Sequence, residues 1–209
     1  MPKWPKNMLM WMLVGTVLLA GYMRWAEAGE PQEKVRRTVE DVLAVVANKT
    51  LQPQERHTKI RQAVLHRFGF EEMAQRSMGQ HWRTLTPQQR QEFVELFTEL
   101  LERSYTSRIA GYKAGPQGIR YPKEEIDADQ AIVYTEITSE RDLATAVNYH
   151  LLHKDGDWKV YDIVIEGVSL VNNYRTQFNT IMLKDSYAGL VKQMRAKLTQ
   201  EQAIAPERG

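Results

Sequence analysis

Histidines are the side chains of this sequence best suited to acid–base or metal chemistry, and their spacing argues against both. The chain has five of them and no cysteine. His150 and His153 lie three residues apart on a predicted strand, where they point to opposite faces and cannot share a metal ion. His57 and His66 are expected on a charged helix surface, and His81 is expected to make a structural hydrogen bond. The histidines therefore predict no metal centre.

Asp162 and Glu166 are the carboxylates whose spacing brings them together. They stand at positions i and i+4 of a predicted strand and so share one face of the sheet. Two such acids could form a catalytic pair. We expect instead a salt bridge or a hydrogen bond to the following helix, with Arg175 as a candidate partner. For an enzyme, Asp162 would be the best candidate for an acid at the floor of a cavity.

Two further stretches fall short of known catalytic or nucleotide-binding motifs. Residues 166–170, EGVSL, contain a single glycine, so the serine is not flanked by glycines as a nucleophile elbow requires. Residues 111–118 contain glycines but lack the Gly-Lys-Ser/Thr ending of a phosphate-binding loop. The sequence therefore predicts a binding protein rather than an enzyme, with no catalytic residue, metal or cofactor.

The elements that position these residues are clearest in residues 155–178, DGDWKVYDIVIEGVSLVNNYRTQF. Asp155-Gly156 matches a tight hairpin turn. The strand after it is rich in β-branched and aromatic residues on both faces, and Gly167 ends it. A helix is then predicted to begin near Ser169. A strand covered on both sides suggests a protein that encloses something apolar.

A long helix precedes the strands. Thr86 can cap it, Pro87 suits its first position, and Gln89 completes a capping box with Thr86. Apolar residues then recur every three or four positions as far as Tyr112, which predicts a helix of about 37 Å at 1.5 Å per residue. A Gly-Pro pair ends the segment.

The remaining periodicity completes an α+β fold class. Further helices are predicted at residues 33–48, 53–68, 70–78, 169–183 and 185–198, and strands at 130–138, 143–153 and 158–166, with an optional edge strand at 119–122. An order of helices, then strands, then helices is typical of an α+β domain. We therefore expect an antiparallel sheet of about four strands, wrapped by N-terminal and C-terminal helices.

Residues 1–28 are predicted to be a secretory signal peptide. A basic start precedes an apolar run at residues 8–21, and the small-x-small sequence AEA at 26–28 is a cleavage site. The alternative is an uncleaved anchor, but the run is shorter than the about 20 residues of a membrane-spanning helix. Cleavage leaves a nearly neutral chain, which argues against a nucleic-acid partner. Without cysteine, an exported chain depends on its core rather than on disulfides.

Two stretches carry a resemblance to a known family. Residues 77–105, SMGQHWRTLTPQQRQEFVELFTELLERSY, and residues 160–178, VYDIVIEGVSLVNNYRTQF, resemble the MlaC or toluene-tolerance family in sequence and in order. The similarity extends over about residues 35–198. It implies an MlaC-like lipid-binding domain at residues 29–198. The terminal position of residues 199–209 predicts a flexible tail.

The resemblance implies a periplasmic phospholipid carrier. In that family, helices and sheet part to leave a deep apolar cavity that holds the acyl tails, while the headgroup stays near solvent. The implied partners are an outer-membrane lipoprotein–porin complex and an inner-membrane ABC transporter with an MCE-domain protein. The implied role is to support the lipid asymmetry of the outer membrane. The implied ligand is a phospholipid, with no cofactor.

The lining of such a cavity follows from the predicted faces of the long helix, the strands and the helix after the sheet. The candidates are Leu101, Tyr105, Ile109, Tyr112, Val133, Val147, Tyr149, Leu151, Tyr161, Ile163, Ile165, Val168, Val171, Tyr174 and Phe178. The strand choices assume one phase of alternation. The opposite phase would select Trp158, Val160 and Val164 instead.

Several alternatives stay open. The apolar stripes could form an ordinary filled core, in which case the protein would act as a docking module. One branch of the same family is associated with hopanoid lipids, whose rigid rings require a wider pocket, and a small-cavity enzyme is a further alternative. Arg175 belongs to the family's Asn-Tyr-Arg segment. It either locks a helix to the sheet or lies near a phosphate, and we favour the structural role.

Overall fold

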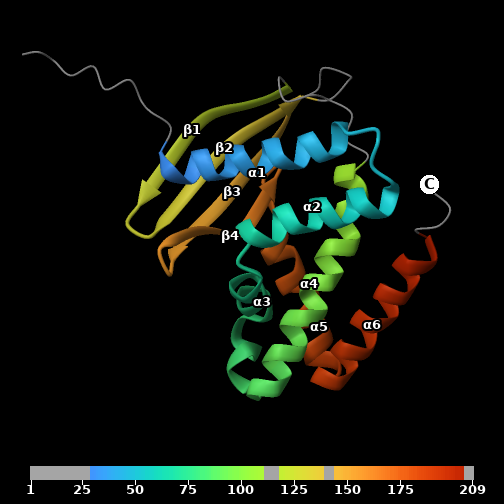
Figure 1. The fold of residues 1–209 in the computed structure, drawn as a ribbon. Coiled ribbons are helices and arrows are strands. Elements are labelled where there is room, and N and C mark those ends of the chain that lie inside the picture. The colour runs from blue at the N-terminus through green and yellow to red at the C-terminus, as the bar shows by residue number, and fades with distance from the viewer. Residues whose placement is uncertain (1–28, 111–117, 139–143, 205–209) are drawn as a thin grey trace, which may run out of the picture.

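The computed structural model describes residues 29–110, 118–138 and 144–204, and Figure 1 shows it as a ribbon. The predicted signal peptide and Tyr112 lie outside the described residues. The fold is α+β: α1 crosses one face of an antiparallel sheet, and α3 to α6 gather below the sheet in the view of Figure 1. No described helix combines the length and the apolar character needed to cross a membrane.

The helices in the described residues follow the predicted segments. They are α1 (Glu30–Ala47), α2 (Pro53–Arg67), α3 (Phe70–Met78), the 3-10 helix η1 (Gly79–Thr84), α4 (Pro87–Ala110), α5 (Leu170–Lys184) and α6 (Tyr187–Ile204). The predicted capping box at the start of α4 is confirmed. The backbone N–H of Thr86 donates to Gln89 Oε1 at 2.9 Å, and the N–H of Gln89 donates to Thr86 Oγ1 at 3.2 Å. The last helix, α6, continues beyond residue 198, where the tail was predicted to begin.

The sheet has one strand more than the about four that the sequence predicted. Its order is β1-β2-β3-β4-β5 and every pairing is antiparallel: β1 (Ile119–Asp127), β2 (Gln130–Thr138), β3 (Ala144–Lys154), β4 (Asp157–Ile165) and β5 (Val168–Ser169). β5 is two residues long, too short to leave a pattern in the sequence. β1 extends well past the edge strand predicted at residues 119–122.

Two tight turns bound β4 and set the register of its hairpins. Asp155 and Gly156 have φ of 53° and 79°, and Glu166 and Gly167 have φ of 49° and 79°. Positive φ at both central residues is typical of a type I′ turn, whose twist matches that of the strands it joins. The predicted turn at Asp155-Gly156 is therefore confirmed. Gly167, predicted only to end the strand, also turns the chain back into β5.

A β-bulge in β4 changes which side chains face each side of the sheet. The β3 neighbours His150 and Leu151 pair with Asp162 and Val160, so Tyr161 has no residue opposite it. The extra residue shifts the alternation by one position. Each of the two phases considered for this strand therefore holds for one half of it.

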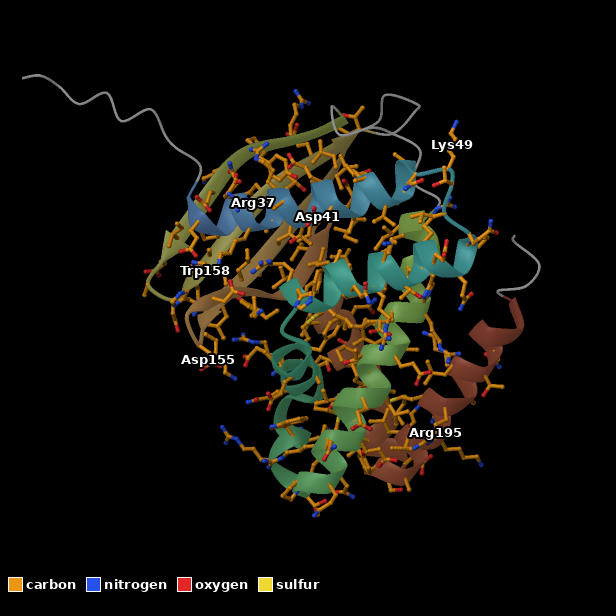
Figure 2. The ribbon with its side chains drawn as sticks, viewed as in Figure 1. Arg37, Asp41, Lys49, Asp155, Trp158 and Arg195 are labelled. Atoms are coloured by element: carbon orange, nitrogen blue, oxygen red, sulfur yellow. The ribbon has the colours of Figure 1, made fainter. Side chains whose placement is uncertain are left out.

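The core consists of two hydrophobic clusters. The sheet cluster lies between the sheet and α1 and contains Val35, Ala131, Val133, Leu151, Trp158 and Val160. The helical cluster is formed by α3, α4, α5 and α6 and includes Phe93 and Phe97 of α4. Phe68, which follows α2, packs against both clusters, so the end of α2 joins the two halves of the core. Figure 2 shows Trp158 nearer to α1 than Asp155, which lies at the tip of the β3–β4 hairpin.

The Asp157 carboxylate fastens α1 and α2 to the β3–β4 hairpin. Its Oδ1 binds Lys34 of α1 and accepts from Arg67 Nη1 of α2 at 3.1 Å, and its Oδ2 pairs with Lys159 at 2.9 Å. Burial opposes ionisation of this carboxyl, but the hydrogen bonds from Lys34, Lys159 and Arg67 outweigh burial and hold the pKa of Asp157 well below its usual range. The carboxylate therefore stays charged and keeps both helices on the sheet.

Candidate functional site

The inner face of the sheet, the face that α1 crosses, brings together most of the strand residues predicted to line a cavity. Tyr149 of β3 lies opposite Val133 of β2 and Ile163 of β4, and residues directly opposite one another share a face. Val147 and Leu151 stand two positions to either side of Tyr149 and share that face as well. Val133, Val147 and Leu151 are buried, whereas Tyr149 and Ile163 keep part of their surface accessible.

The middle strand of the sheet, β3, has less contact with helices than the strands on either side of it. α1 packs over β1 and β2, and α2, α3 and α5 reach β4, but no helix packs extensively on β3 within the described residues. Tyr149 of β3 shows how this limited helix contact affects a side chain. Burial, with a smaller contribution from Tyr121, raises the pKa of the Tyr149 hydroxyl above its usual value, yet the side chain retains accessible surface. Tyr149 is therefore deeply placed in the sheet and is not completely covered by the described helices.

The predicted lining residues of α4 and α5 belong to the helical cluster instead. Leu101, Val171, Tyr174 and Phe178 are buried there, and Tyr105 packs against it. They therefore lie in a different part of the core from Tyr149 and Ile163, and the structure does not bring the two groups into one cluster.

Aromatic rings hold α5 to α4 within the helical cluster. The Tyr174 ring meets Phe97 edge-on at 5.3 Å between centroids, and the Phe178 ring meets Phe93 edge-on at 5.4 Å. Edge-to-face pairs are favourable beyond the area they bury, by about 0.5–1.5 kcal/mol. Tyr174 and Phe178 thus have a clear packing role.

The other predicted lining residues are more dispersed. Tyr161, at the bulge, packs against the helical cluster, with the Arg76 guanidinium 4.1 Å from its ring centroid. Ile165 lies opposite Val147 but is 39% exposed, and Val168 is 61% exposed. Ile109 is partly exposed near the end of α4, and Tyr112 lies outside the described residues.

Asp162 fastens the sheet to the start of α5. Its Oδ2 accepts from the Ser169 hydroxyl at 2.5 Å, and its Oδ1 accepts from the Val171 N–H at 3.0 Å. Ser169 is itself the N-cap of α5, because its Oγ accepts from the Asn172 N–H at 3.0 Å. The predicted hydrogen bond from Asp162 to the following helix is confirmed, and both carboxylate oxygens have structural partners.

Arg175, the candidate partner of Asp162, does not bind it; Ser169 and Val171 do. Arg175 lies beside the C-terminal end of the neighbouring helix α3. A Cβ placed on Gly79, the C-cap of α3, would lie 2.8 Å from Arg175 Nε. Arg175 therefore adjoins a helix rather than locking α5 to the sheet. Glu166, at the exposed end of the same strand, accepts from the Ala146 N–H at 2.5 Å, so Asp162 and Glu166 have separate partners.

Three of the five histidines, His81, His150 and His153, have structural side-chain neighbours. His81 Nε2 and Asn179 Oδ1 are 2.9 Å apart, which confirms the hydrogen bond expected of His81. His153 packs against Trp158, and His150 meets Tyr161 edge-on. Across the described ranges, no cluster of three or more histidines and acids has the arrangement of a metal site.

Four residues that adjoin the inner face were not selected from the sequence. Val35 and Val39 of α1, Phe68 and Tyr121 of β1 all pack in or against the sheet cluster. The apolar stripe of α1 was a usable signal for the two valines, since such a stripe faces a core. Tyr121 gave none, because it lies on an edge strand of mostly polar residues. Burial raises the pKa of Tyr121 to about 12.

The fold and this face define a class: a small α+β protein whose antiparallel sheet keeps an apolar, incompletely covered face under helices. The family model described as MlaC protein matches residues 36–196. The chain belongs to the MlaC family, which confirms the resemblance seen in the sequence.

Known relatives agree with this assignment. The "Intermembrane phospholipid transport system binding protein MlaC" of Haemophilus influenzae is 24% identical over 172 residues, which cover 81% of this chain and 80% of the relative. The "Toluene tolerance protein ttg2D" of Pseudomonas putida is 29% identical over 136 residues, 60% of each chain. A solved structure of a phospholipid-binding protein from Ralstonia solanacearum, in complex with a phospholipid, has a TM-score of 0.74 and 26% identity. The similarity covers 83% of this chain and 99% of that one.

Proposed function

We propose that this protein carries phospholipid, with the acyl tails held between the inner face of the sheet and the surrounding helices. The observation that carries the proposal is the structural likeness to the R. solanacearum protein in its phospholipid complex, which extends over nearly all of that chain. This chain's geometry supports the same use. The partly accessible Tyr149 and Ile163 supply apolar surface on β3 and beside it, and β3 has less contact with helices than the strands on either side of it.

In this proposal the tails lie along β3. Val147, Tyr149 and Ile163 form the floor, and Ile109 near the end of α4 contributes from the helical side. Tyr174 and Phe178 lie behind this lining rather than in it, since their rings pack on Phe97 and Phe93. The lining is therefore narrower than the full set of candidates from the sequence.

The energetics explain why a carrier needs no catalytic group. Exposing one methylene to water costs about 0.8 kcal/mol, so two tails with about 30 methylenes cost about 24 kcal/mol. A bare lipid therefore does not cross an aqueous compartment at a useful rate. An apolar pocket that replaces the contacts of the bilayer makes the exchange nearly neutral. Among the described strand residues, Asp162 is the only buried acid, and both of its carboxylate oxygens bind residues at the start of α5.

We further propose that the carrier works in the periplasm, after removal of residues 1–28 as a signal peptide. There it would exchange lipid with an outer-membrane lipoprotein–porin complex and with an inner-membrane ABC transporter that has an MCE-domain protein, and so support outer-membrane asymmetry. The name of the H. influenzae relative, which places that protein in an intermembrane phospholipid transport system, supports this assignment.

Native mass spectrometry of the chain beginning at Gly29, purified from a periplasm, tests the proposal. Adducts of phospholipid mass that disappear on delipidation are expected, and lipid extraction identifies headgroup and tails. Adducts of hopanoid mass would show that the ligand is a polycyclic lipid rather than a phospholipid. A bare protein mass, with no uptake of lipid from liposomes, would overturn the carrier and favour a filled core.

A further inference from the structure

Gly79, which has no side chain, leaves space for the Arg175 guanidinium beside the end of α3. Gly79, which follows the last residue of α3, has φ of 54° and ψ of −129°, a conformation that residues with side chains rarely adopt. A Cβ at Gly79 would lie 2.8 Å from Arg175 Nε and 3.3 Å from its Nη2. Glycine is therefore needed at this position both for the backbone conformation and for the close approach of the arginine.

The Arg175 guanidinium is not bound, by a hydrogen bond or an ion pair, by any residue in the part of the chain that the structure describes. Other arginines of the helical half are paired: Arg76 binds Glu72 at 2.6 Å, and Arg195 binds Glu92 at 2.9 Å. A guanidinium has five N–H donors in a fixed plane, so Arg175 keeps its full capacity for a ligand.

Arg175 lines a pocket of about 370 Å³ where α3, η1 and α5 meet. The lining residues are Met78, Gly79, Gln80, Arg175, Thr176, Asn179 and Thr180. They include one full positive charge and no carboxylate. The hydrogen bond between His81 and Asn179 engages the Asn179 carbonyl oxygen, which leaves its amide N–H₂ group as an additional donor. Such a lining favours an anion over a cation or a neutral ligand.

We propose that this pocket, the Arg175 pocket, binds a phosphate-type oxyanion, with the Arg175 guanidinium donating to two of its oxygens. The planar fork of an arginine matches two phosphate oxygens, and charge-assisted bonds of this kind are about twice as strong as neutral ones. None of the residues that line the Arg175 pocket lies on the sheet, so it is separate from the proposed site of the acyl tails. The same chemistry is offered by a lipid headgroup and by free phosphate.

Tail-free probes test the Arg175 pocket whether or not the tail site exists. Inorganic phosphate and glycerophosphoglycerol are titrated into the mature chain at constant ionic strength, with chloride as the reference, and backbone and arginine side-chain NMR signals are followed. We expect saturable shifts at Gly79, Gln80 and Asn179 and at the Arg175 Nε–H. The R175Q variant should bind at least about tenfold more weakly, since it loses the charged fork.

Two further variants separate binding from folding. Gly79→Ala should also weaken binding, because its methyl group displaces Arg175. The matched control is R83Q: Arg83 is an exposed arginine of η1 that does not line the pocket, so its loss should leave the affinity unchanged within about twofold. Far-ultraviolet circular dichroism and thermal unfolding of each variant verify that it is folded.

The relative affinities of the probes identify the source of the anion. Tighter binding of the phosphodiester indicates a lipid headgroup, and tighter binding of inorganic phosphate indicates free phosphate. Shifts that do not saturate, that are spread over the whole protein, or that persist unchanged in folded R175Q would overturn the proposal.

Discussion

Val160 and Ile163 face the same side of the sheet, although they stand three residues apart on one strand. Val160 lies opposite Leu151 and Ile163 lies opposite Tyr149, and both pack in or against the sheet cluster. The bulge at Tyr161 produces this arrangement, because it adds one residue to β4 without adding one to β3. Ile163 is thereby placed beside the partly accessible Tyr149, in the middle of the inner face.

A tryptophan at position 163 should therefore reduce lipid binding. Ile163→Trp, alone or with Val147→Trp, adds bulk where the proposed tails lie, so the variant should copurify with at least about tenfold less lipid while keeping its fold. Overpacking is expected to reduce stability by about 1–3 kcal/mol. Lipid extraction and mass spectrometry measure the loss, and circular dichroism checks the fold.

Asn148 offers a matched control on the same sheet. It stands between Val147 and Tyr149 on β3 and therefore points to the opposite face. Asn148→Trp adds similar bulk and should leave the lipid content unchanged. An equal loss of lipid in both variants, or no loss in Ile163→Trp, would contradict the inner-face location of the tails.

The bulge also shows what could be predicted of the fold. The Asp155-Gly156 turn and the capping box of Thr86 and Gln89 were predicted correctly, because each depends on local chemistry. The bulge at Tyr161 was not, because it is defined by pairing with β3 and the strand is apolar on both faces. Neither phase of alternation could therefore be right along the whole strand.

The candidate site was predictable to a similar extent. Apolar periodicity on α4 and α5 identified buried residues such as Leu101 and Phe178 correctly. Periodicity states only that a helix face is covered; it does not state by what. Phe178 is covered by Phe93 and Phe97 rather than by the sheet, and that choice depends on how the helices pack in three dimensions.

The link between Asp162 and Ser169 should matter for stability and not for lipid binding. Asp162→Asn weakens the bonds to the Ser169 hydroxyl and the Val171 N–H. We expect the free energy of unfolding to fall by about 1–3 kcal/mol, because the Asp162 side chain is buried. Ser169→Ala removes the N-cap of α5 and should cost about 1 kcal/mol. Urea denaturation measures both.

Coupling between these two changes provides the check. Since the residues share one hydrogen bond, the double variant should lose less stability than the sum of the single variants. Lipid content should stay at the level of the unaltered protein. A folded and equally stable Asp162→Asn variant that had lost its lipid would show that Asp162 contacts the ligand.

Asp157 should make the stability depend on acid pH. Because its pKa in the folded protein is well below the about 3.9 of an unfolded aspartate, its ion pairs stabilise the fold above about pH 4, and this contribution is lost as the pH falls toward the folded-state pKa. The side chain is 31% exposed, so we expect about 1–2 kcal/mol at pH 7. The difference in unfolding free energy between the protein and Asp157→Asn should therefore shrink below pH 4.

Asp155→Asn is the control for this measurement. Asp155 occupies the tip of the same hairpin, and asparagine also tolerates its positive φ. Its replacement should change the stability at pH 7 by less than about 0.5 kcal/mol. A difference for Asp157→Asn that stayed constant from pH 7 to pH 3 would show that Lys34 and Arg67 contribute without the carboxylate charge.

Glu124 should couple the start of α1 to the edge of the sheet. Its Oε2 accepts from the Gly29 N–H at 2.8 Å, and its Oε1 accepts from the Gln32 N–H at 2.6 Å. A carboxylate at this position satisfies free amides of the first helical turn and complements the helix dipole. A Cβ on Gly29 would lie 2.1 Å from Oε2, so Gly29→Ala should displace the carboxylate, and Glu124→Gln should cost about 1–2 kcal/mol.

Cleavage after Ala28, as the sequence predicts, would strengthen this contact. The Gly29 nitrogen would become a charged amino terminus, and its hydrogen bond to Glu124 would become an ion pair. A chain that begins at Gly29 should therefore be about 0.5–1 kcal/mol more stable at pH 6 than one that begins at Ala28, and Glu124→Gln should abolish the difference. Thermal unfolding of the four proteins measures the coupling. Equal stability of the two unaltered chains, or a difference that persists in Glu124→Gln, would show that no such ion pair forms.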